Sequence, residues 1–189
     1  MSHHIYTTPG FVVDSYPNGE SGKFIYIFTR DLGMVAGVAT GIRLSQSKLR
    51  YHAQDFSLSN FSLVRGKEVW RIVGAESIAA DTPPTLSPLF VRVLKILRRL
   101  IPGEEKNEIL FETILSAYYH LASDQSHHQN VEYIIMLRIL HQLGYIRKVA
   151  TLEVFLTDHS FTPELIATME PLKLFAVKEI NSALKESHL

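Results

Sequence analysis

The spacing of the apolar residues changes at residues 81–88, where the chain reads DTPPTLSP. Adjacent prolines hold a chain extended and disfavour helix in the residue before each of them. Upstream, short apolar runs alternate with turn residues, as is typical of strands, and downstream apolar residues recur every three or four positions, as in amphipathic helices. The sequence therefore predicts an α+β protein with a β domain over residues 1–80, a proline-rich linker over 81–88 and an α-helical domain over 89–189.

The β domain contains five runs of strand-like composition. They are FVVDSY, KFIYIFT, GMVAGVA, DFSLSNFSLV and KEVWRIVGA, which begin at residues 11, 23, 33, 55 and 67. A longer stretch with partly helical character separates the third run from the fourth. Five strands with such a connection predict an OB-fold, a small β-barrel. Because 46% of the residues are hydrophobic, the chain can bury its cores without metal or disulfide cross-links.

Finer patterns predict details of this barrel. Phe24, Tyr26 and Phe28 share one parity, so we expect them to fill the barrel interior. The apolar phase of the fourth run slips near Asn60, which predicts an extra residue there that forms a bulge or a sharp bend, and Arg65-Gly66 predicts a two-residue hairpin turn. Glycines at 33, 37 and 41 indicate close backbone packing or strong curvature.

The region after residue 88 shows helical spacing and predicts a bundle of five helices. They cover about residues 89–100, 107–123 and 130–143, a stretch opened by Thr162-Pro163-Glu164, and a last stretch from Pro171 towards the end. Ser87 and Pro88 stand in cap and first-turn positions, and Gly144 stands where a left-handed C-terminal cap is expected. One side of the last helix is predicted to carry Leu174, Val177, Ile180 and Leu184.

The overall charge is balanced, with 19 basic and 19 acidic residues. The whole chain therefore lacks the positive charge typical of nucleic-acid-binding proteins. The sequence contains no cysteine, no signal-peptide pattern and no apolar run long enough to span a bilayer. We therefore expect a protein that is neither exported nor membrane-spanning and that works in the cytoplasm.

Motifs of catalysis and of cofactor binding are missing from the sequence. It contains no GxSxG, P-loop or GxGxxG motif, and its nine histidines include no pair of the HExxH type. We therefore expect no enzymatic activity, no cofactor and no metal site. A hydrolase or nucleotide-using enzyme stays the third alternative, after the two described below.

A local basic run, IRLSQSKLR, places Arg43, Lys48 and Arg50 within eight residues and includes no acid. Clustered cations attract phosphate, and neighbouring hydroxyl groups can donate hydrogen bonds to phosphate oxygens. The alternative is an ordinary solvated loop. Binding of single strands by OB-folds usually adds aromatic platforms, for which Tyr16 and Trp70 are candidates beside Tyr26.

Two blocks of the sequence resemble the bacterial recombination-repair family RecO. The first block comprises Glu20-Ser21, Thr29, Gly33, Gly41, Arg43, Ser47, Leu49, Gln54 and Phe56. The second comprises Leu110-Phe111, Leu115, Leu121, Leu137-Arg138-Ile139-Leu140 and Leu143-Gly144-Tyr145. The order of the two blocks agrees with an OB domain followed by paired helices that end in a Leu-Gly-Tyr signature.

The sequence departs from this family at several positions. Thr40 stands where a lysine is common, Asp55 replaces a usual proline, and Ile135-Met136 replace Phe-Glu. The four-cysteine zinc module of many relatives is absent after Tyr145, as in a compact form of the family. Thr40 removes a positive charge where phosphate contact is expected, so DNA affinity is reduced or moved to other residues.

The resemblance implies a non-enzymatic mediator of recombinational repair in the RecF pathway. Such proteins bind single- and double-stranded DNA, promote strand annealing, pair with RecR, and contact the tail of the single-stranded DNA-binding protein to help load RecA. They are cytoplasmic and associated with the nucleoid. The DNA contacts expected here are Arg30, Arg43, Lys48 and Arg50, with Arg65, Lys67 and Arg71 as weaker candidates. The cations nominated for partner binding are Arg98, Arg99 and Arg138, on helices with strong apolar stripes.

An adaptor that binds only proteins is the second hypothesis. In this interpretation the barrel has lost DNA contact and only the partners of the same pathway bind. The neutral overall charge and Thr40 both favour it.

Overall fold

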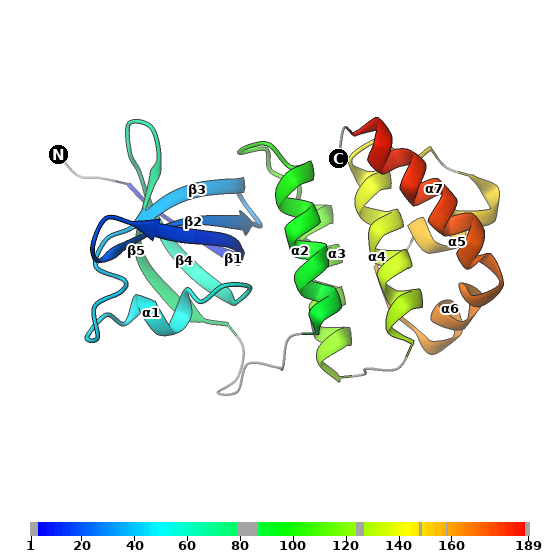
Figure 1. Ribbon diagram of the computed structural model, residues 1–189, viewed down its shortest axis with the longest axis horizontal. Coiled ribbons are helices and arrows are strands. Elements are labelled where there is room, and N and C mark those ends of the chain that lie inside the picture. Colours follow the sequence, from blue (N-terminus) through cyan, green and yellow to red (C-terminus); the bar gives the residue numbers. More distant parts are fainter. Residues whose placement is uncertain (1–3, 79–86, 124–126, 148, 158, 188–189) are drawn as a thin grey trace. The chain divides into compact units, whose positions relative to one another are not determined.

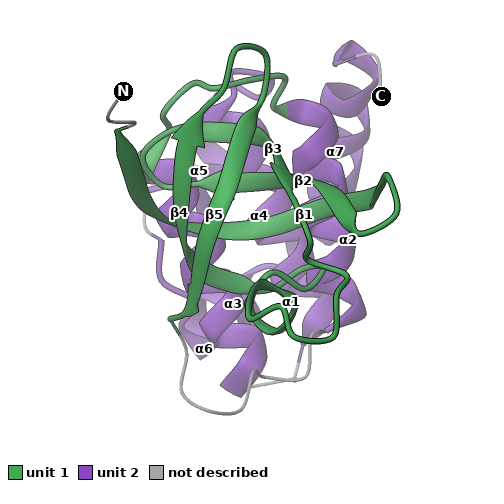
Figure 2. Ribbon diagram, turned by 90° about the vertical axis from the view of Figure 1, so that its left-hand side faces the viewer, with its two compact units in different colours: residues 1–84, 101–108 green, residues 85–100, 109–189 purple. Residues whose placement is uncertain are grey.

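The computed structural model describes residues 4–78, 87–123, 127–147, 149–157 and 159–187 (Figure 1). The chain divides into two compact units (Figure 2): unit 1 comprises residues 1–84 and 101–108, and unit 2 comprises residues 85–100 and 109–189. Unit 1 thus includes a segment that the sequence suggested for the helical domain. The predicted linker over 81–88 falls mostly on residues 79–86, which lie outside the described ranges.

Unit 1 is built on five strands that close into a barrel. They are β1 (Ile5–Asn18), β2 (Gly22–Thr29), β3 (Gly33–Ala39), β4 (Leu58–Arg65) and β5 (Trp70–Ser77). Their order around the barrel is β1-β2-β3-β5-β4, and β4 pairs back with β1. The pairing of β3 with β5 is parallel and the others are antiparallel. A short helix, α1 (Leu49–His52), lies between β3 and β4, which confirms the predicted OB-fold.

The face of β2 that lines the barrel interior is not the one that the sequence predicted. Ile25 and Ile27 are fully buried in the interior cluster, whereas Phe24 and Tyr26 are half-buried on the outer face. Phe28 is buried but is not part of this cluster. The prediction that these aromatic residues fill the barrel is wrong, because both alternating sets of β2 are apolar and the pattern did not distinguish the two faces.

The irregularities of the sheet also differ from the predicted ones. Val13 is the extra residue on β1 opposite β2, and Val73 is the extra residue on β5 opposite β4. The extra residue predicted near Asn60 is wrong, because β4 pairs with β1 in one unbroken register from Leu58 to Val64, and the extra residue of the β4–β5 ladder lies on β5. The predicted two-residue hairpin is wrong as well, because the ladder ends at the pair Arg65 and Trp70 and leaves residues 66–69 as a longer connection.

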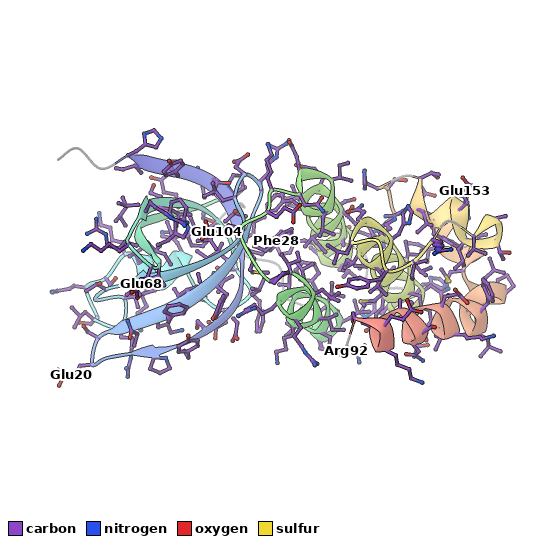
Figure 3. The ribbon with its side chains drawn as sticks, turned by 90° about the horizontal axis from the view of Figure 1, so that it is seen from above. Glu20, Phe28, Glu68, Arg92, Glu104 and Glu153 are labelled. Atoms are coloured by element: carbon purple, nitrogen blue, oxygen red, sulfur yellow. The ribbon has the colours of Figure 1, made fainter. Side chains whose placement is uncertain are left out.

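Residues 101–108 return to the barrel as part of unit 1. The Met34 amide donates to the Gly103 carbonyl at 3.1 Å. The backbone of Glu105 approaches Gly33 so closely that a Cβ there would overlap it, and Gly33 has a φ of 73°, in the left-handed region. This confirms the predicted close packing at Gly33. Figure 3 labels Glu104 on this segment, together with Glu20 and Glu68 on the β1–β2 and β4–β5 connections.

Replacing Gly33 with alanine is expected to destabilise unit 1. A side chain in the left-handed region costs about 1–2 kcal/mol, and the new Cβ would also push the Glu105 backbone away. Urea unfolding followed by circular dichroism measures the change. Gly103→Ala is the matched control, because nothing lies within 4 Å of a Cβ there. Equal stability of the two variants would contradict the close approach.

Unit 2 is helical and confirms the five predicted helices. The elements of this region are α2 (Pro88–Leu100), α3 (Glu108–Ser123), α4 (His128–Gln142), η1 (Ala150–Leu152), α5 (Glu153–Leu156), α6 (Pro163–Thr168), η2 (Glu170–Leu172) and α7 (Lys173–Glu186). Thr162 caps α6 by accepting from the Leu165 amide at 3.3 Å, and Gly144 has the predicted left-handed conformation after α4. The sequence missed η1 and α5, which are too short to show a period.

Helix α4 is the centre of unit 2. It packs against α2, α5, α6 and α7, and residues 134–140 are all buried. The stripe predicted for α7 is partly wrong: Leu174 is 84% exposed, and the buried residues are Ala176, Ile180 and Ala183. Small alanine side chains form the packed face of this helix instead of Leu174. Within the described residues, no helix is both long and apolar enough to cross a bilayer.

Candidate nucleic-acid interface

A cavity of about 510 Å³ opens in unit 1, beside the connection between β3 and β4. It is lined by Lys23, Ile42, Arg43, Arg50, Ala53, Gln54 and Asp55. Lys23 comes from the start of β2, Arg43 from the loop after β3, and Arg50 from α1. Three cations from three separate elements therefore meet at one hollow.

Apolar anchors hold the loop between β3 and β4 in place. Ile42 and Ala53 are 3% and 2% exposed and belong to the barrel core, against which Leu49 packs. The Arg43 amide also donates to the Ser21 carbonyl at 2.9 Å. Because the buried residues fix the loop at both ends, the charged side chains between them remain exposed to solvent.

Lys23 and Asp55 form a polar cluster at the cavity wall. The Lys23 Nζ lies 3.0 Å from the Ser15 Oγ and 3.5 Å from an Asp55 carboxylate oxygen, and the Ser15 hydroxyl also donates to Asp55. The side chains of Lys23 and Asp55 are 29% and 46% exposed. Three cations face one carboxylate among the lining residues, so the cavity favours an anion such as phosphate.

The structure brings together two of the three cations predicted in the basic run. Arg43 and Arg50 both line the cavity, whereas Lys48 is exposed on the same loop without lining it. The Arg50 guanidinium also lies 5.8 Å from the ring centroid of Tyr51, whose side chain is 63% exposed. The run from 43 to 50 is thus exposed to solvent, and two of its three cations, Arg43 and Arg50, lie at the cavity.

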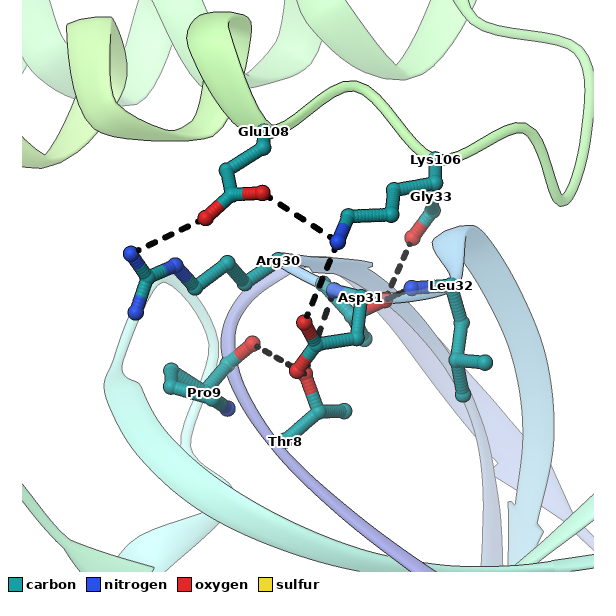
Figure 4. A network of polar contacts seen from close by, with 9 residues as sticks. Thr8, Pro9, Arg30, Asp31, Leu32, Gly33, Lys106 and Glu108 are labelled. Atoms are coloured by element: carbon teal, nitrogen blue, oxygen red, sulfur yellow. Dashed lines mark hydrogen bonds and ion pairs between the residues drawn. The ribbon is translucent and has the colours of Figure 1, made fainter.

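Arg30 and Arg65 pair with acids of the segment 101–108, and Figure 4 shows the pair of Arg30 with Glu108. An Arg30 Nη lies 3.1 Å from the Glu108 carboxylate, which also pairs with Lys106 at 3.1 Å, and Arg65 pairs with Glu104. Both arginine side chains are about half exposed, at 42% and 54%. Exposed pairs contribute about 0–1 kcal/mol, so they lower the attraction for phosphate without removing it.

Lys67 and Arg71 lie on the β4–β5 hairpin. Lys67 is exposed in the connection, and Arg71 is exposed on the outer face of β5. Trp70, its neighbour, is 4% exposed and belongs to the barrel interior. This placement excludes Trp70 as a platform for bases and leaves Arg71 on the accessible face.

The three cations nominated for partner binding differ in accessibility. Arg98 is half-buried and Arg99 exposed at the end of α2, but Arg138 in α4 is 1% exposed. The Arg138 Nε donates to the Phe155 carbonyl at 2.7 Å and an Nη donates to the Ser160 carbonyl at 2.9 Å. Its guanidinium lies 4.6 Å from the ring centroid of Phe161. Arg138 thus contacts Phe155, Ser160 and Phe161, and a role in partner binding stays a prediction.

The sequence did not indicate Lys23, Gln54 or Asp55 as members of the site. Lys23 lies about twenty residues before Arg43, at the start of a strand, and nothing in its local pattern links it to the loop. The antiparallel pairing of Lys23 with Ala39 and the packing of the β3–β4 loop on the barrel core place them together. As for metals, the described residues contain no group of three or more His, Cys, Asp or Glu side chains that could hold an ion.

Comparison with known proteins agrees with this architecture. The family model described as "Recombination protein O N terminal" matches residues 1–80. Proteins named "DNA repair protein RecO" from Dehalococcoides mccartyi strain 195 and Ralstonia nicotianae are 26% and 30% identical to this chain over 170 and 124 residues. Another, from Rubrobacter xylanophilus, is 35% identical over 74 residues.

The matched regions differ in extent. They cover 85% of this chain for the Dehalococcoides mccartyi protein, 64% for the Ralstonia nicotianae protein and 39% for the Rubrobacter xylanophilus protein. The chain in turn covers 67%, 45% and 30% of the relatives. A closed OB-fold barrel lies at the matched N-terminal region, and the match to DNA repair proteins named RecO continues into the helical unit. Residues 1–80 are therefore an N-terminal domain of the RecO type, and the chain is similar to RecO proteins beyond it.

Proposed function

We propose that this chain binds DNA at the barrel cavity and acts as a non-enzymatic mediator of DNA repair by recombination. The observation that supports the proposal is the meeting of Lys23, Arg43 and Arg50 around one hollow. Arginine presents a planar fork of donors that matches phosphate, and lysine adds a compact charge. The names of the relatives, which concern DNA repair, support the biological role.

Salt dependence of DNA binding tests this proposal. Fluorescence anisotropy of a labelled single strand, and of a labelled duplex, is measured with the full chain over a range of salt concentrations. Each phosphate contact contributes a slope of about −0.7 for single strands or −0.9 for duplex in a plot of log K against log salt. Three cations therefore predict a slope of roughly −2 to −3. No binding at low salt, or binding that salt does not weaken, would contradict the proposal.

The finer part of the proposal concerns partners. We infer that the chain promotes annealing of complementary strands and helps load RecA, together with RecR and the tail of the single-stranded DNA-binding protein. Its similarity to RecO proteins supports this inference. Annealing of complementary strands coated with single-stranded DNA-binding protein, with and without this chain, tests it. An unchanged annealing rate would refute this part alone.

A protein-binding adaptor is the second candidate function. It is favoured by the pairing of cations with acids within unit 1, where Lys23 contacts Asp55, Arg30 contacts Glu108 and Arg65 contacts Glu104. Binding to RecR or to the tail peptide, without DNA binding at low salt, would select this candidate. DNA binding with the expected salt slope would exclude it.

Replacing Asp55 with asparagine is expected to strengthen DNA binding. The change removes the carboxylate that contacts Lys23 and leaves an amide of similar shape. An exposed pair is worth about 0.2–1 kcal/mol, which corresponds to a roughly 1.4- to 5-fold gain in affinity. The same anisotropy titration measures it, and Glu153→Gln on α5 controls for the change in net charge. Weaker binding by the Asp55 variant would show that Asp55 supports the site.

A further inference from the structure

The cavity of unit 1 lies at one end of the barrel. Lys23 is the second residue of β2 and pairs with Ala39, the last residue of β3. Side chains alternate along a strand, so Lys23 shares its face with Ile25, which is fully buried in the barrel core. The ends of β-barrels are common places for ligand pockets, and a volume of about 510 Å³ is within the usual range for such pockets.

The barrel core closes this cavity on one side. Ile42 and Ala53 line the cavity and also belong to the core cluster. The Lys23 side chain is 29% exposed, whereas Arg43 and Arg50 are open to solvent. The cavity thus has an apolar wall, one half-buried cation and two exposed cations. A DNA strand that continues in both directions must leave such a hollow on both sides, whereas the end of a strand can enter it.

The charges around the cavity match a phosphate monoester better than a phosphodiester. The lining residues include three cations, Lys23, Arg43 and Arg50, and one carboxylate, Asp55, so their charges sum to +2. A phosphate monoester carries a charge of about −1.5 to −2 at pH 7 and has three acceptor oxygens. A phosphodiester of the DNA backbone carries only about one negative charge. With a monoester, each cation can donate to an oxygen of its own.

We propose that the cavity binds the terminal phosphate of a DNA strand. Lys23 meets this phosphate from the barrel side, and Arg43 and Arg50 meet it from the loop and from α1. Lys48 is exposed on the same loop outside the cavity, so it is available to the next phosphates of the strand. The inference rests on the proposed DNA binding and adds which part of the DNA the cavity selects.

The test compares strands that differ in their ends. Anisotropy is measured with the full chain and internally labelled strands of about 16 nucleotides that carry a phosphate at the 5′ end, at the 3′ end or at neither. A slightly longer strand with two hydroxyl ends matches the total charge. We expect at least one phosphorylated strand to bind at least about fivefold more tightly than the charge-matched strand. Equal affinities would overturn the terminal-phosphate site while DNA binding itself stands. No binding of any strand would overturn the proposed function as well.

Two substitutions test whether the cavity is responsible for the preference. Lys23→Gln is expected to bring the affinities for the phosphorylated and the charge-matched strand within about twofold of each other. Arg43→Gln, at an exposed position of the loop, is expected to lower the preference as well. Lys67→Gln is the matched control, because it removes an exposed cation of unit 1 that does not line the cavity, and it is expected to keep the preference. A preference that survives in both Lys23→Gln and Arg43→Gln would overturn the proposal.

A free nucleotide offers the same phosphate monoester as a strand end, so thymidine monophosphate distinguishes the two sources. It is added as a competitor to the labelled phosphorylated strand, beside the unlabelled strand. We expect half-displacement to need at least about tenfold more nucleotide than strand, because a single nucleotide has no further phosphates for Lys48 to attract. Equal potency would assign the cavity to free nucleotides and overturn the strand end as its ligand.

Discussion

Replacing Arg43, Lys48 and Arg50 together with glutamate is expected to lower DNA affinity by at least about tenfold at low salt. Arg43 and Arg50 line the cavity and Lys48 is exposed on the same loop. Their charges attract phosphate, and the substitution both removes this attraction and introduces repulsion. The slope of log K against log salt is expected to become less negative by about 1.4 for single strands, because the two phosphate contacts of Arg43 and Arg50 are lost. Anisotropy titrations over a range of salt concentrations measure both quantities.

The control for this experiment reverses three charges elsewhere on the chain. Arg147, Lys178 and Lys185 are exposed residues of unit 2, so their replacement by glutamate changes the net charge by the same amount. If only the overall charge mattered, both variants would lose affinity alike. We expect the control to keep most of the affinity and the slope. Unchanged binding in the first variant would refute the assignment of the basic run to DNA.

Replacing Arg138 with methionine is expected to destabilise unit 2 by roughly 1–3 kcal/mol, because one buried carbonyl would be left without its donor and one half-buried carbonyl would lose a donor as well. These are the carbonyls of Phe155 and Ser160, to which the guanidinium donates at 2.7 and 2.9 Å. Methionine fills most of the volume but donates nothing, so packing changes little. Domains are stable by only about 5–15 kcal/mol, so the loss is a large fraction. Urea unfolding followed by circular dichroism measures it.

Arg99→Met in α2 is the matched control, since it makes the same change at an exposed helical position. Its effect is expected to stay within about 0.5 kcal/mol. Arg138→Lys is expected to fall between the two, because one ammonium group can still donate to one of the carbonyls. If Arg138→Met were as stable as the wild-type chain, Arg138 would not be what holds the segment 155–161, and a direct role in partner binding would gain support.

Local patterns in the sequence were sufficient for the class of fold. Short apolar runs with turn residues predicted five strands, and a spacing of three or four predicted the helices. Thr162 and Gly144 marked helix ends correctly because capping depends on residues only a few positions apart. The basic run from Arg43 to Arg50 was likewise visible, because its charges are neighbours in the chain.

Contacts between residues far apart in the chain decided which face of β2 lies inside the barrel and which residues line the cavity. Both faces of β2 are apolar, so only closure of the barrel determined that Ile25 and Ile27 lie inside and that Phe24 and Tyr26 lie outside. The pairing of β2 with β3, which sets Lys23 opposite Ala39, brought Lys23 to the cavity.

The residues of the candidate site also show which features depend on local sequence and which depend on contacts between distant residues. The sequence nominated Arg30 and Arg65 for DNA, but the return of residues 101–108 to the barrel pairs them with Glu108 and Glu104. It nominated Arg138 as a cation on a helix, and the packing of α4 buried that cation. Alone, therefore, the sequence determined the OB-fold, the helices and the basic loop. The tertiary structure decided which charges share a surface, because that depends on contacts between residues far apart in the chain.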